Sequence, residues 1–124
     1  MGRLLRHADF ERVYKDGRRH FSANMTVFYL PQVSAGDWRI GFTVSRALGG
    51  AVVRNRMRRR LREAVRLKRT GVSGAVDVVI NPKKSLLTAD FQQLLNEVDR
   101  ALEVIQKKLA ESNRKSDGRP GIQI

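Results

Sequence analysis

Hydrophobic residues along this chain follow two periods, and these periods predict its helices and strands. Apolar residues spaced three or four positions apart, as on one face of a helix, mark residues 10–14, 53–69 and 91–109. Apolar runs typical of strands mark residues 25–30, 38–44 and 75–80. We expect Gly17 to end the first helix and Thr88 to cap the start of the last one.

The order helix, strand, strand, helix, strand, helix predicts an α+β fold with helices over one face of a mixed sheet. We expect the first two strands to pair as an antiparallel hairpin. Gly41, inside the second strand, indicates a bulge or a close approach by another backbone. Residues 1–111 are expected to form one domain and residues 112–124 a disordered tail, since the tail has glycine, proline and mixed charge.

The helix predicted at residues 53–69 has almost a single sign of charge. Between Arg54 and Arg69 there are nine basic residues and one acid, Glu63, for a local net charge of +8. On a helical wheel, the apolar stripe consists of Val53, Met57, Leu61, Ala64 and Leu67. The opposite face consists of Asn55, Arg58, Arg59, Arg62, Arg66 and Arg69.

The remaining arginines of this helix lie near its stripe. Arg54 and Arg56 flank the stripe, and Arg60 falls close to it. We expect the Arg60 stem to lie on apolar surface with its guanidinium outside. Like charges one turn apart destabilise a helix, and guanidinium groups match phosphate geometry. The helix therefore indicates an anionic polymer as partner in preference to a solvated charged face.

Composition supports a basic, cysteine-free binding protein. The chain has 124 residues and a net charge of +13, and its sequence pI is about 11.4. Such charge suits nucleic acid, the ribosome or an anionic membrane surface. The absence of cysteine excludes disulfides and thiolate sites and fits a reducing cytosol. No apolar run is long enough to span a bilayer, and we see no secretion signal.

Residues for catalysis are scarce, whereas aromatic residues are suitably placed for RNA. His7 and His20 have no zinc-site spacing, and the glycines at 49–50 lack the lysine of a phosphate-binding loop. We therefore expect no catalytic residue and no metal ligand in the chain. Phe10, Tyr14 and Phe28 would offer stacking faces for single strands if they meet across one cleft; core packing is the alternative.

Two stretches resemble the signature of the bacterial ribonuclease P protein subunit. Residues 41–46 read Gly-Phe-Thr-Val-Ser-Arg, and residues 49–63 read Gly-Gly-Ala-Val-Val-Arg-Asn-Arg-Met-Arg-Arg-Arg-Leu-Arg-Glu. Residues 9–17, Asp-Phe-Glu-Arg-Val-Tyr-Lys-Asp-Gly, are similar to the opening helix of that family. Two positions depart from the family: Arg46 replaces the usual lysine, and Gly50 stands where asparagine is common.

The resemblance implies a two-layer α/β sandwich with a mixed four-stranded sheet and a left-handed strand–helix–strand crossover. The fourth strand would lie at residues 21–24 or arise from a split of the strand at 25–30. In the cytoplasm, the protein of this family assists a catalytic RNA, and this RNA removes the 5′ leader of precursor tRNA. Mg²⁺, held mainly by that RNA, supplies the hydrolytic chemistry of this endonuclease.

Carried over by position, a basic set would contact the catalytic RNA and an aromatic set the leader. The basic set is Arg46, Arg54, Asn55, Arg56, Arg58, Arg59 and Arg62. The aromatic set is Phe10, Tyr14 and Phe28. The expected partners are thus the catalytic RNA and precursor tRNA, without DNA or membrane. A structural ribosomal RNA-binding protein is the alternative, and a peripheral membrane protein fits less well because Arg60 interrupts the apolar stripe.

Overall fold

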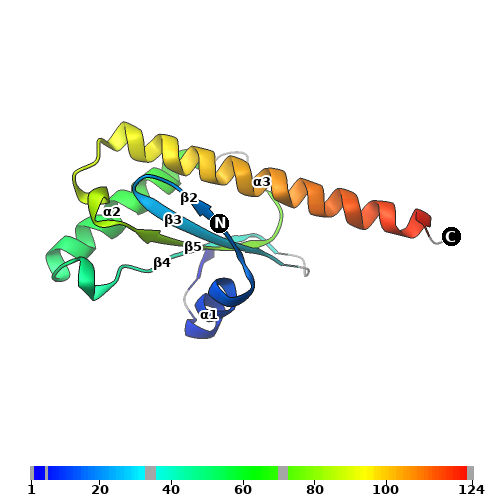
Figure 1. The fold of residues 1–124 in the computed structure, drawn as a ribbon, viewed down its shortest axis with the longest axis horizontal. Coiled ribbons are helices and arrows are strands. Elements are labelled where there is room, and N and C mark those ends of the chain that lie inside the picture. The colour runs from blue at the N-terminus through cyan, green and yellow to red at the C-terminus, as the bar shows by residue number, and fades with distance from the viewer. Residues whose placement is uncertain (1, 5, 33–35, 70–72, 123–124) are drawn as a thin grey trace.

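A five-stranded mixed sheet lies at the centre of the protein, with helices on both faces (Figure 1). The computed structural model describes residues 2–4, 6–32, 36–69 and 73–122. The strands are β1 (Gly2–Arg3), β2 (Arg18–Phe21), β3 (Met25–Pro31), β4 (Trp38–Phe42) and β5 (Val76–Pro82). The helices are α1 (His7–Asp16), α2 (Ala51–Lys68) and α3 (Phe91–Ile122), with short 3-10 turns η1 (Arg46–Leu48) and η2 (Lys84–Leu87). The predicted α+β class, with its mixed sheet, is confirmed.

The strand order is β1-β4-β5-β3-β2. β5 lies between the strands expected to form a hairpin: it is antiparallel to β3 and parallel to β4. The predicted hairpin is therefore wrong, because the chain leaves β4 through α2 and returns as β5 into the space between β4 and β3. Every residue from 76 to 80 is buried, which suits a central strand covered on both faces.

The sheet has one strand more than the family resemblance implied. β2 pairs antiparallel with β3 at one edge, and the two-residue β1 pairs parallel with β4 at the other. The expected fourth strand at residues 21–24 overlaps β2 only at Phe21, and β3 runs unbroken through residues 25–31. β2 carries the consecutive arginines Arg18 and Arg19, and it forms an edge of the sheet, where charge hinders unwanted pairing.

Alternating side chains separate two hydrophobic cores. Met25, Val27 and Tyr29 point from β3 into the main core, which α2 and α3 cover. On the opposite face, Val79 packs with Leu4 and with Val13 of α1. The expectation of helices on one face is wrong, since α1 lies across the sheet from α2 and α3 (Figure 1).

The apolar stripe of α2 is confirmed except at its C-terminal end. Met57, Leu61 and Ala64 are fully buried, but Leu67 is 45% exposed and Val65 is buried in its place. On the wheel, Val65 and Leu67 lie on opposite flanks of the stripe. The tilt of α2 against its neighbours decides which flank is covered, and the sequence period does not specify it.

We expected the Arg60 guanidinium to extend into solvent, but it binds carbonyl oxygens of the protein instead. Its guanidinium donates hydrogen bonds to the carbonyl oxygens of Leu86 (2.6 Å), Leu87 (2.8 Å) and Ala89 (2.5 Å). These carbonyls belong to the turn η2 and the segment before α3. The guanidinium thus joins α2 to the connection between β5 and α3.

The helix α3 ends later than predicted, and Thr88 does not cap its start. It starts at Phe91, whereas Thr88 ends the turn η2, so the predicted capping role of Thr88 is wrong. The helix then continues through Ile122, across most of the range expected to be a disordered tail. Residues 123–124 lie outside the described residues, and the division of the chain into domain and tail stays a prediction.

Arg60→Met should lower the free energy of unfolding by roughly 2 kcal/mol, because methionine keeps an apolar stem while three carbonyls lose their charged donor. Arg59→Met is the matched control: Arg59 is the exposed neighbour on α2, and its replacement should change stability by less than about 0.5 kcal/mol. Urea denaturation of both variants measures the difference. Equal stability of the two variants would contradict a structural role for Arg60.

Candidate nucleic-acid interface

A glycine turn sets the start of the basic helix. Gly49 has φ 149°, a conformation that favours glycine, and an added Cβ would lie 2.9 Å from a methyl carbon of Val53. Arg54 Nε donates to the Gly49 carbonyl oxygen at 3.1 Å, so this arginine also braces the turn. A Cβ added to Gly50 would meet no atom within 4 Å, so a side chain would fit at this end of α2.

The predicted RNA-contact residues lie on the outer surfaces of α2 and on η1. Arg46, Asn55, Arg56, Arg59 and Arg62 are exposed, and the other two, at positions 54 and 58, are half-buried. Within this group the structure shows one side-chain hydrogen bond, from Arg58 Nη1 to Asn55 Oδ1 at 3.1 Å. Asn55, Arg58, Arg59 and Arg62 lie on the face of α2 opposite its buried stripe, as the wheel predicted, whereas Arg54 and Arg56 flank the stripe and Arg46 lies on η1. Their contact with RNA stays a prediction.

The single acid of α2 is paired with one of its arginines. Arg66 Nη2 lies 2.6 Å from Glu63 Oε1, and both side chains are exposed. The hydrogen bond from Arg66 holds the pKa of the Glu63 carboxyl below its usual value and raises the pKa of the guanidinium. Glu63 therefore stays ionised and neutralises one neighbour, while the arginines at 58, 59 and 62 have no carboxylate within 4 Å among the described residues.

A hollow of about 540 Å³ joins the basic helix to the opening helix. On one side its lining is the arginine row of α2, Arg58, Arg62, Arg66 and Arg69. On the other side it is largely apolar, with Leu4, Phe10, Ile40 and Phe42. A polyanion in this hollow would meet charge along one wall and apolar surface along the other. The last two arginines of this row were not among the predicted RNA contacts.

Phe10 reaches this hollow by lying over a glycine. A Cβ added to Gly41 would fall 2.5 Å from the Phe10 ring and 3.0 Å from the backbone oxygen of Leu4. The predicted close approach at Gly41 is confirmed: both a ring and a backbone segment come near it. Any side chain at this position would push Phe10 away from the sheet.

The other two aromatic residues meet one turn further along α1. The rings of Tyr14 and Phe28 are 4.8 Å apart at 87°, an edge-to-face pair. The Tyr14 hydroxyl lies 2.7 Å from Thr43 Oγ1 and 2.9 Å from Asn81 Oδ1. Tyr14 and Phe28 therefore line the same place on the sheet, while Phe10 lies at the hollow.

Beyond Tyr14 the sheet face is partly open. Thr26, Phe28, Thr43 and Asn81 are all half-buried there, and they come from or directly follow three neighbouring strands. This open sheet face, defined by these four residues and Tyr14, combines two aromatic rings with hydroxyl and amide groups. Such a surface can stack a base and hydrogen-bond its edges.

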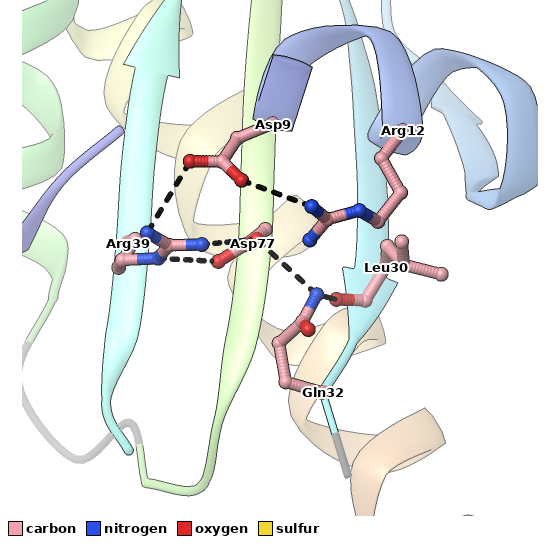
Figure 2. A network of polar contacts seen from close by, with 6 residues as sticks. All are labelled: Asp9, Arg12, Leu30, Gln32, Arg39 and Asp77. Carbon is pink, nitrogen blue, oxygen red and sulfur yellow. Dashed lines mark hydrogen bonds and ion pairs between the residues drawn. The ribbon is translucent and has the colours of Figure 1, made fainter. Parts of the chain in front are cut away.

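An ion-pair network positions α1 over the sheet (Figure 2). Arg39 on β4 donates from Nε (2.8 Å) and Nη2 (2.7 Å) to the two carboxylate oxygens of the buried Asp77 on β5. Its Nη1 lies 3.5 Å from Asp9 Oδ2 on α1, and Arg12 lies 3.4 Å from the other oxygen of Asp9. Gln32 Nε2 also donates to Asp77, at 3.2 Å. The hydrogen bonds to Asp77 raise the pKa of Arg39.

These contacts give Asp77 a structural role. The network ties the first turn of α1 to two central strands, and the position of Phe10 and Tyr14 follows from it. Among the described residues no three His, Cys, Asp or Glu side chains gather to hold a metal ion. The two carboxylates closest to the sheet face, Asp9 and Asp77, face guanidinium groups instead.

Sequence reasoning missed Arg19. Its guanidinium carbon lies 5.4 Å from the centre of the Phe28 ring, within the range of a cation–π contact. The signal was available only through strand register: β2 pairs Arg19 directly opposite Phe28. The sequence did not predict β2 as a strand, so it could not show which face of the sheet Arg19 lies on.

Comparison with known proteins agrees with this geometry. A family model described as Ribonuclease P matches residues 2–106. The ribonuclease P protein component of Oleidesulfovibrio alaskensis is 45% identical over 85 residues, 68% of each chain. That of Staphylococcus aureus is 30% identical over 109 residues, 86% of this chain and 95% of the relative.

Solved structures share the fold. The Staphylococcus aureus RNase P protein superposes with a TM-score of 0.73 at 26% identity, covering 85% of this chain and 95% of the other. The Thermotoga maritima RNase P protein gives a TM-score of 0.67 at 28% identity, with 81% and 97% covered. Sequence, fold and the basic helix therefore agree: this chain belongs to the ribonuclease P protein family.

Proposed function

We propose that this chain binds the catalytic RNA of ribonuclease P through α2 and the single-stranded 5′ leader of precursor tRNA through the aromatic side of α1. It would do so in the cytoplasm, as a subunit of the endonuclease that removes the leader. The observation that supports this most directly is the placement of Arg58, Arg59 and Arg62 on the exposed side of a helix whose other side is buried; none of the three has a carboxylate within 4 Å among the described residues.

The arginines of α2 would act on phosphates. Each guanidinium presents planar donors that match a phosphate, and each contact releases counterions from the RNA. Two RNAs that approach each other repel through their backbones. A cationic helix between them lowers this repulsion, so the complex should need less Mg²⁺ to assemble.

The leader would follow the sheet face from the hollow toward Tyr14 and Phe28. Base stacking on an aromatic side chain does not depend on sequence, because every base has a π-face. A leader differs in sequence from one precursor to the next, so stacking and phosphate contacts suit it better than base-specific readout. Phe10, next to the arginine wall, would link the two RNA-binding surfaces.

Mg²⁺ would be held mainly by the RNA. When bound there, the metal would supply an activated water and would stabilise the charge that develops at the phosphodiester. The chain would orient the substrate. Arg39 forms ion pairs with Asp9 and Asp77, so these carboxylates are better explained as anchors of α1 than as metal ligands.

The first test is cleavage of precursor tRNA by the catalytic RNA at low Mg²⁺, with and without this chain. Addition of the chain should restore cleavage at Mg²⁺ concentrations where the RNA alone is slow, because the protein replaces part of the cationic charge. A structural ribosomal protein would bind RNA without this effect. Unchanged cleavage rates across the Mg²⁺ series would exclude the proposed function.

Arg56→Ala and Arg62→Ala should each weaken binding to the catalytic RNA and flatten its salt dependence. The slope of log K against log salt should change by roughly 0.7–0.9 for each lost phosphate contact. Arg54 is a poorer choice because it also braces Gly49. Arg100→Ala, on α3, removes an equally exposed charge and serves as the control. Identical slopes in all three variants would show that the charge of α2 acts without defined contacts.

A further inference from the structure

The edge strand β2 presents two different faces, and one of them continues the open sheet face. Register places Arg19 opposite Phe28 and Phe21 opposite Thr26, on the side of the sheet that α1 covers. Arg18 and His20 pair with Tyr29 and Val27, whose side chains belong to the main core. Burial, with a smaller contribution from the charge of Arg100 on α3, lowers the pKa of His20, as expected on the α3 side.

The Arg19 guanidinium is exposed and could bind an anion in its present position. Its guanidinium lies over the Phe28 ring, which restrains the side chain without using its N–H groups. The side chain is exposed, and among the described residues no carboxylate lies within 4 Å of it. A phosphate here would meet a guanidinium already held in place, so little conformational entropy is lost on binding.

Phe21 is an unusually exposed aromatic side chain. It is 67% exposed, whereas Phe10, Tyr14 and Phe28 are half-buried. It lies two residues beyond Arg19 on the same face of β2, a separation of about 7 Å along an extended strand. Next to it, Lys83 Nζ donates to the Ser22 carbonyl oxygen at 3.0 Å, so a further positive charge borders this end of the strand.

We infer that Arg19 and Phe21 form a nucleotide subsite at the β2 edge, where Phe21 stacks a base of a single-stranded RNA and Arg19 binds a neighbouring phosphate. This inference rests on the proposed function, since the strand it would hold is the leader. The subsite extends the open sheet face outward, past Tyr14 and Phe28. It should therefore be occupied only by leaders long enough to cross the sheet.

The alternative explanation for these residues is protection of a sheet edge. Arginines on an edge strand hinder pairing with a second chain. Their removal would then cause self-association and leave leader binding unchanged. Arg18, on the same strand but on the opposite face, separates the two explanations, because it protects the edge equally and does not face the open sheet surface.

The experiment measures the affinity of the reconstituted holoenzyme, this chain with its catalytic RNA, for precursor tRNAs with a series of leader lengths and for mature tRNA. Phe21→Ala should weaken binding of long-leader precursors about five- to a hundredfold, the range for loss of one stacked base. Arg19→Ala should weaken the same precursors and reduce their salt slope, with Arg19→Lys restoring part of it. Phe21→Leu, which keeps the apolar area without a π-face, should behave like Phe21→Ala.

The series of leader lengths also separates failure of the β2 subsite from failure of the proposed function. Arg18→Ala should bind all substrates as the unchanged chain does, and no variant should affect mature tRNA or the shortest leaders. If the unchanged chain favours long leaders and both Arg19→Ala and Phe21→Ala keep that preference, the subsite is wrong while the proposed function stands. If the unchanged chain shows no leader preference, the proposed leader binding fails first. Self-association of Arg19→Ala in sedimentation, without loss of leader affinity, would likewise overturn the subsite.

Discussion

Burial of β5 on both faces is the constraint on which the rest of this structure depends. A strand with apolar side chains on both faces is suited to the interior of a sheet, and here it lies between β3 and β4. That placement turns β4, α2 and β5 into a crossover and puts the basic helix on one face of the sheet. It also brings Asp77 to the other face, where Arg39 and Asp9 use it to position α1.

The concentration of charge on α2 is tolerated because its opposite side is well anchored. Met57, Leu61 and Ala64 are fully buried, and Arg60 binds three carbonyls beyond the helix. Arginines that would destabilise an isolated helix by mutual repulsion are thus held on a rigid support. The same repulsion then favours binding, since a polyanion relieves it. Not every arginine of the helix is available: those at positions 54 and 60 have structural partners, and Arg66 is neutralised by Glu63.

The hollow and the open sheet face, which we propose as the RNA-binding surfaces, lie side by side along α1, the sheet and α2. Phe10 shares a hollow with the arginine row of α2, while Tyr14 contacts Phe28 on the sheet. A single network, from Asp9 through Arg39 to Asp77, positions the helix that supplies both aromatic residues. Movement of α1 would therefore change the hollow and the open sheet face together. This coupling is consistent with the proposed binding of a folded RNA and a flexible strand at the same time.

The sequence by itself determined the local features, because these depend on period, charge and turn chemistry. The helical period located α1 and α2 and most of the buried side of α2. Apolar runs located β3, β4 and β5, and the run of arginines indicated an anionic polymer as partner. Tertiary structure decided the rest. It determined which strands are neighbours, that α1 covers the second face, that Val65 is buried and Leu67 exposed, and that Arg60 binds carbonyls. It also turned residues 18–21 into an edge strand and so brought Arg19 onto Phe28. These outcomes depend on contacts between residues far apart in the chain, and the pattern of neighbouring residues does not record such contacts.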